Sequence, residues 1–135
     1  MVEVVNRQRR LKVDTETWAA FAEKAIGAIG SSESSAIIAF VSDQKIRQLN
    51  RQFRGIDKAT DVLSFPSDGP EDELGDIAIS VETAALQAKE NGLSFENEIA
   101  QLILHGLLHL SGYNHETDNG EMNRLELRLR RKLGI

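Results

Sequence analysis

The hydrophobic positions of this 135-residue chain follow two different spacings. Apolar residues recur at helical intervals behind polar residues that favour helix N-termini, and this pattern predicts five helices. The expected N-terminal residues are Asp14 or Thr15, Ser42 or Asp43, Ser80, Ser94, and Asp118 with Glu121 as a capping box. Short β-rich apolar runs predict four strands, at Val2–Val5, Ala36–Val41, Asp61–Phe65 and Leu74–Ile79. The order of elements predicts one α+β domain over residues 1–135, with a mixed sheet of about four strands packed with about five helices.

Two of these segments carry a more specific expectation. The run Ala36–Val41 is apolar throughout, which predicts a strand buried on both faces near the centre of the sheet. The helix that follows it carries Ile46, Leu49 and Phe53 on one stripe and should stop at Gly55.

Composition narrows the class of protein. The chain contains no cysteine, so a bound metal would have nitrogen and oxygen ligands. No apolar run reaches the length of a membrane span and no signal peptide is recognisable, so we expect a soluble, cytoplasmic protein. The net charge of −5 argues against a protein that coats nucleic acid through bulk electrostatics, but it leaves room for a local basic groove. Basic residues gather in three groups: Arg7, Arg9, Arg10 and Lys12; Arg47, Arg51, Arg54 and Lys58; and Arg128, Arg130, Arg131 and Lys132.

All three histidines of the chain, His105, His109 and His115, fall within one short window in its C-terminal half. His105 and His109 are four residues apart in an apolar run long enough for a helix, so both rings should leave the same helix face. Gly112 allows the left-handed conformation that ends a helix, which would turn His115 back toward the pair. Three imidazoles on one Zn²⁺ leave a fourth tetrahedral position open, as in catalytic zinc sites. The window therefore predicts one zinc ion per chain, held by these three histidines.

The alternatives to this interpretation are a structural role for the histidines and a different hydrolytic reaction. A single histidine on an apolar helix is more often a core residue, but an imidazole pair buried without partners would lose hydration with little compensation. Metzincin metalloproteases use the same ligand spacing, H-E-x-x-H-x-x-G-x-x-H. Here Gly106 takes the place of their general-base glutamate. The site suits phosphodiester chemistry better, and a hydrolase of peptides or small molecules is the weaker alternative.

A second segment with candidate chemistry is Leu49–Pro66, which joins a helix end, a polar turn and a strand. Arg54 can hold a phosphate through two parallel hydrogen bonds. Alternatively, Arg54 caps its own helix or pairs with Asp57 or Asp61. The sequence leaves both interpretations of Arg54 open.

Together these segments resemble, in order and spacing, the YbeY family of bacterial ribosomal RNA maturation endoribonucleases. The resemblance rests on Leu49–Pro66, on Leu74–Ile77 with Ser80, and on the stretch H-G-x-L-H-L-x-G-Y-x-H at residues 105–115. The chain departs from the usual family pattern at Phe53, Ala59 and Asn114, where tyrosine, proline and aspartate are common. Asn114 puts a second-shell carboxylate role at that position in doubt, because an amide carries no charge.

The resemblance implies a zinc-dependent endoribonuclease specific for single strands, which acts in 3′-end maturation of small-subunit ribosomal RNA and in ribosome quality control. It implies zinc bound by the three histidines and a functional arginine at Arg54. It also suggests precursor ribosomal RNA, small-subunit ribosomal proteins and an assembly GTPase as partners.

In the mechanism that follows, the catalytic residues are Arg54 and His109. Arg54 neutralises the scissile phosphate, and His109 acts through the metal-bound water. The nucleophile stays open between that water and the ribose 2′-OH. Glu98 and Asp118 are candidates for proton transfer from their position alone. The principal rival is a ribosome-assembly factor that binds RNA and uses its metal to stabilise the fold.

Overall fold

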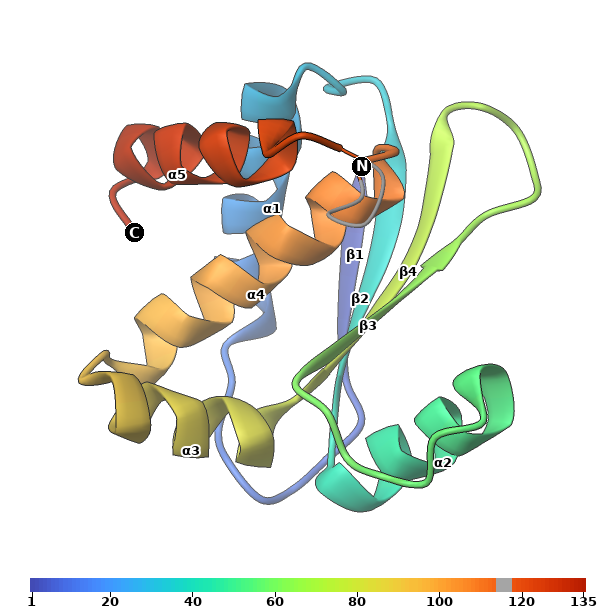
Figure 1. Ribbon diagram of the computed structural model, residues 1–135, viewed down its shortest axis with the longest axis vertical. Helices are drawn as coiled ribbons and strands as arrows, with labels where there is room; N and C mark the ends of the chain where they lie inside the picture. Colours follow the sequence, from blue (N-terminus) through green and yellow to red (C-terminus); the bar gives the residue numbers. More distant parts are fainter. Residues whose placement is uncertain (114–117) are drawn as a thin grey trace.

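A four-stranded sheet runs through the middle of the molecule, with helices on both of its faces (Figure 1). The structure is a computed structural model, and it describes residues 1–113 and 118–135. The strands are β1 (Val2–Asn6), β2 (Ser35–Val41), β3 (Val62–Pro66) and β4 (Glu73–Ser80). The helices are α1 (Thr15–Ile29), α2 (Asp43–Arg54), α3 (Val81–Asn91), α4 (Phe95–Leu110) and α5 (Glu121–Leu133). The predicted α+β fold with a mixed sheet is confirmed.

The strand order is β1-β2-β4-β3. β1 is parallel to β2 and β2 is parallel to β4, whereas β3 is antiparallel to β4. β3 therefore forms one edge of the sheet, and α4 packs against both β3 and β4. This arrangement brings the end of the Leu49–Pro66 segment next to the histidine-bearing helix.

The larger core lies between the sheet and the helices α1 and α4. Ile38 and Ile77 of the sheet and Leu107 of α4 are fully buried there. A smaller core lies under α2 on the opposite face and contains Val41, Ile46, Leu63 and Ala78. No helix in the described part of the chain has the length and apolar composition needed to cross a membrane.

The α2 face of the sheet is covered only in part. β2 is an inner strand, as predicted, but the expectation of burial on both faces is wrong at Ile37, which is 40% exposed. The reason is that α2 starts directly after β2 and packs near Val41, so it does not reach the opposite end of the strand. The stripe on α2 is also only partly buried, because Phe53 is 59% exposed and packs edge-on against Phe65.

Polar side chains begin four of the five helices as expected, namely Asp14, Ser42, Ser80 and Ser94. The predicted capping box at α5 is wrong. Gly120 occupies the N-cap position, and no side chain caps the helix from there. The Asp118 carboxylate instead accepts from the backbone N–H groups of Gly120 and Met122, and Glu121 accepts from the backbone of Asn119. A side chain therefore still accepts from a backbone N–H group in the first turn of α5, but it belongs to Asp118, two residues before the N-cap.

Candidate functional site

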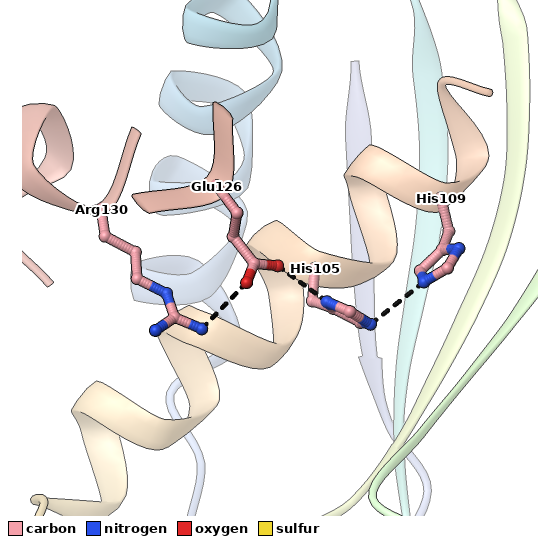
Figure 2. Close-up of polar contacts among 4 residues, drawn as sticks. All are labelled: His105, His109, Glu126 and Arg130. Carbon is pink, nitrogen blue, oxygen red and sulfur yellow. Dashed lines mark hydrogen bonds and ion pairs between the residues drawn. The ribbon is translucent and has the colours of Figure 1, made fainter. Parts of the chain in front are cut away.

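His105 and His109 leave α4 on the same side and point toward each other (Figure 2). Their Nε2 atoms lie 3.1 Å apart, and the ring planes are inclined at 72°. Two nitrogens bound tetrahedrally to one zinc at 2.0–2.1 Å would lie about 3.3 Å apart. The pair therefore has the separation and direction that two imidazole ligands of one ion require.

The predicted third ligand, His115, lies outside the described residues, as does Asn114. Within residues 1–113 and 118–135, no group of three histidine, aspartate or glutamate side chains is arranged to hold a metal. The chain continues from α4 through Gly112, whose φ of 100° is the left-handed turn expected from the sequence. Two nitrogen donors on one helix face, with no thiolate in the chain, form the described part of a donor set that suits zinc.

Glu126 of α5 holds the other side of the His105 ring. Its Oε1 lies 2.7 Å from Nδ1 of His105, and its Oε2 accepts a hydrogen bond from Nη2 of Arg130 at 3.0 Å (Figure 2). A carboxylate can only accept, so this contact assigns the Nδ1 proton to His105 and leaves the Nε2 lone pair directed at the partner ring.

Sequence reasoning missed Glu126. The signal was present, because Glu126 lies between Met122 and Leu129 on the inward stripe of α5 and is 5% exposed. A carboxylate on an apolar stripe calls for a buried partner.

The histidine pair opens into a cleft of about 560 Å³ beside the edge strand β3. The side chains that line it include Arg54, Thr60, Asp61, Ser64, His105, His109 and Tyr113. Arg54 comes from the end of α2, so the two segments singled out in the sequence meet across this cleft. Polar and apolar side chains line the cleft together, with side chains from residues 60–66 on the β3 side and the histidine pair on the α4 side.

The sequence left open that Arg54 caps its own helix or pairs with Asp57 or Asp61, and the described residues form none of these contacts. Asp57 is held by Arg47 through two hydrogen bonds of 2.8 and 3.2 Å, and this ion pair lowers the pKa of Asp57. The Asp61 carboxylate accepts from the backbone N–H of Val62. Arg54 lines the cleft and has no hydrogen bond or ion pair with another described residue, so its guanidinium is available there.

Gly106, at the position of the metzincin base, faces the sheet instead of the cleft. A Cβ atom at Gly106 would lie 2.9 Å from Cδ1 and 3.1 Å from Cγ2 of Ile77, which is 1% exposed. Glycine is therefore required by the close approach of α4 to β4. A larger residue at this position, including the glutamate of the metzincin pattern, would therefore have to displace Ile77.

The two candidates for proton transfer occupy different surroundings. Asp118 lies at the start of α5, where its carboxylate accepts the two backbone N–H groups described above. Glu98 is 5% exposed, and burial raises its pKa, as does the neighbouring Asp61. Asn91 and Arg130 act in the opposite direction on the same carboxyl group.

The raised pKa of Glu98 predicts a pH-dependent cost to stability. A carboxyl whose pKa is higher in the folded state favours folding below its unfolded pKa, and this contribution is lost as the pH rises through the folded value. Glu98→Gln should therefore raise the melting temperature at pH 8, and the gain should shrink toward pH 4. Thermal unfolding followed by circular dichroism at several pH values measures this. Glu90→Gln at an exposed position is the control, and a lower melting temperature for Glu98→Gln at pH 8 would contradict the prediction.

Comparisons of this chain with known proteins, by sequence and by structure, find relatives that match nearly its whole length. The profile of the family described as "Endoribonuclease YbeY" matches residues 3–134. The endoribonuclease YbeY of Koribacter versatilis is 45% identical over 134 residues, which cover 98% of this chain and 86% of that protein. The YbeY of Solibacter usitatus is 57% identical over 93 residues, 69% of this chain and 62% of that protein.

The fold has a solved counterpart. The solution structure of TM1509 from Thermotoga maritima superposes with a TM-score of 0.71 at 28% identity, covering 98% of this chain and 89% of the other. The family profile spans the cleft, the edge strand and the helices that carry His105, His109 and Glu126. The chain belongs to the endoribonuclease YbeY family.

Proposed function

We propose that this protein is a zinc-dependent endoribonuclease that cleaves single-stranded RNA, with zinc held by His105, His109 and His115. The observation that carries the proposal is the pair of imidazole Nε2 atoms 3.1 Å apart in a cleft that also contains Arg54. Membership of the endoribonuclease YbeY family supports RNA as the substrate.

The chemistry divides between the metal and the side chains of the chain. A zinc ion bound at the pair supplies Lewis acidity toward a phosphate oxygen or an attacking water. Arg54 binds the scissile phosphate with its planar fork and neutralises charge on the phosphoryl oxygens. Glu126 fixes the tautomer and ring orientation of His105.

The attacking group is open between water and the ribose 2′-OH. Attack by water would leave a 5′-phosphate on one product, whereas attack by the 2′-OH would leave a cyclic phosphate. End-group analysis of the cleaved RNA separates the two.

In the cell, we propose that the substrate is precursor ribosomal RNA in the cytoplasm, cleaved during 3′-end maturation of the small subunit and during ribosome quality control. Small-subunit ribosomal proteins and an assembly GTPase are the proposed partners. These proposals rest on the family to which the chain belongs.

Metal removal tests the proposed activity directly. The purified protein, with its zinc content measured, is incubated with precursor ribosomal RNA with and without a chelator. We expect cleavage to fall at least about a hundredfold after chelation and to return when zinc is added, because charge stabilisation by the ion contributes several kcal/mol. Cleavage that ignores the chelator but is lost in His109→Ala would contradict zinc dependence, whereas cleavage that ignores both would indicate a contaminating nuclease.

A second candidate function is RNA binding by an assembly factor with a structural metal. It is favoured by the His105–Glu126 contact, because this contact ties the metal-site helix to α5, so that an ion would also hold the C-terminal helix in place. Circular dichroism before and after chelation separates the two functions. A structural metal predicts loss of helix on chelation, whereas a catalytic metal predicts a folded protein that no longer cleaves RNA.

Glu126 gives a prediction on metal affinity that does not depend on RNA cleavage. Glu126→Gln keeps the shape of the side chain but removes the charge that holds the Nδ1 proton of His105 and pairs with Arg130. Zinc affinity should fall 10- to 100-fold, roughly the cost of losing an outer-shell partner. Competition with a chromophoric chelator measures the affinity, and Glu96→Gln at an exposed position of the first turn of α4 is the control. Equal affinities for Glu126→Gln and wild type would exclude this role.

A further inference from the structure

A second groove starts at His105 and leads away from the cleft, bounded by α3, α4 and α5. Its lining includes three amide side chains, Gln87, Asn91 and Gln101, and we call it the amide groove. It has a volume of about 800 Å³ and shares Asp61 and His105 with the cleft. The two depressions therefore adjoin each other at Asp61 and His105.

The charges of the amide groove exclude a phosphate. Four carboxylates line it, those of Asp61, Glu90, Glu98 and Glu126. Arg130 supplies the positive charge of the lining, and its Nη2 already donates to Glu126. A neutral group that offers N–H donors fits this lining, because carboxylate and amide oxygens both accept.

Glu98 supplies an acceptor inside this lining. The residue is 5% exposed, and its Oε1 has no hydrogen-bond partner among the described residues. Asn91 hydrogen-bonds the same carboxyl group, and Nε of Arg130 is a buried donor without a partner among the described residues of the same lining. Unsatisfied buried groups are costly, so an acceptor and a donor left over beside a candidate active site point to a ligand that offers both, as the edge of a nucleobase does. Gln101 lies one turn after Glu98 and one turn before His105 on α4, so the three residues share one face of the helix and all line the groove.

We propose that the amide groove binds the nucleobase of a nucleotide next to the scissile phosphate, and that Glu98 and Gln101 select bases with an exocyclic amine over uracil. This inference rests on the proposed ribonuclease function. A phosphodiester held between Arg54 and the histidine pair has a nucleoside on each side, so one of them extends along the surface that continues past His105. Carboxylates accept from the N4 amine of cytosine, and glutamine pairs with the N6 and N7 groups of adenine.

The test compares single-stranded oligonucleotides that differ only by cytosine or uracil at each position around one cleavage site. Cytosine and uracil have nearly the same shape, but cytosine carries an amine where uracil has a carbonyl. Cleavage rates are measured with zinc, and binding is measured by fluorescence anisotropy in the presence of chelator. The variants are Glu98→Gln, whose side chain can both donate and accept, and Gln101→Leu, whose side chain can do neither. Gln48→Leu on the exposed side of α2 is the matched control for Gln101→Leu.

We expect wild-type protein and Gln48→Leu to prefer cytosine about tenfold at one flanking position, and we expect both groove variants to reduce the preference to less than about twofold. Cleavage without any preference in wild type, or a preference that survives both substitutions, would overturn the inference while the ribonuclease function stands. Discrimination in binding without cleavage would support the groove and overturn the proposed reaction. Binding of a lysine-rich peptide that the groove variants abolish, with no base preference, would overturn the inference in favour of a protein ligand.

Discussion

The His109→Ala variant is expected to lose zinc and to cleave RNA at least about a thousandfold more slowly than wild type. His109 presents its Nε2 to the same point in space as His105, so its removal leaves an incomplete ligand set. Loss of the ion removes several kcal/mol of transition-state stabilisation, which corresponds to a rate factor on the order of 10³. Atomic absorption measures the zinc content, and single-turnover cleavage with enzyme in excess over RNA measures the rate.

The control for His109→Ala is a measurement of whether the protein stays folded without metal. His109 is only partly buried and lies at the C-terminal end of α4, so the variant and the chelated wild type should unfold at similar temperatures. Asn97→Ala on the same helix controls for substitution in α4 and should keep both zinc and activity. Retained cleavage by a zinc-free His109→Ala protein would contradict the proposed function. Loss of helical structure at room temperature in both this variant and chelated wild type would favour the structural metal.

The parts of the site that could be predicted from sequence are those governed by local geometry. The spacing of His105 and His109 fixes a common helix face whatever the tertiary structure, and the structure has both rings on that face. The left-handed turn at Gly112 is equally local. The N-caps of the first four helices follow from side chains within three residues of the groups they bind.

The parts that could not be predicted depend on contacts between distant segments. Glu126 reaches His105 from 21 residues away, and only the packing of α5 on α4 brings them together. The exposure of Ile37 depends on how far α2 extends over the sheet, which the apolar run itself does not encode. The sequence shows that Gly106 lacks the protease base, but only the packing of α4 on β4 shows that a Cβ at this position would crowd Ile77.

The Arg54→Ala variant is expected to slow the cleavage step by about a hundredfold while leaving zinc content unchanged. Arg54 lines the cleft opposite the histidine pair, and Asp57, the acidic partner suggested by the sequence, is already paired with Arg47. Removing one donor to a transition state typically lowers kcat by a factor of 10² to 10³. Arg54→Lys should recover only part of the rate, because an ammonium lacks the two-pronged geometry of the guanidinium.

Arg51→Ala is the matched control, because Arg51 lies one turn earlier on α2 and carries the same charge at an exposed position. If long-range attraction of RNA by basic residues were the main effect, both substitutions would raise KM to a similar extent and leave kcat unchanged. A phosphate clamp at the reacting bond instead predicts a loss in kcat for Arg54→Ala alone, at any salt concentration that keeps the enzyme saturated. Equal kinetics for the two variants would remove Arg54 from the catalytic residues and leave it as part of a basic surface.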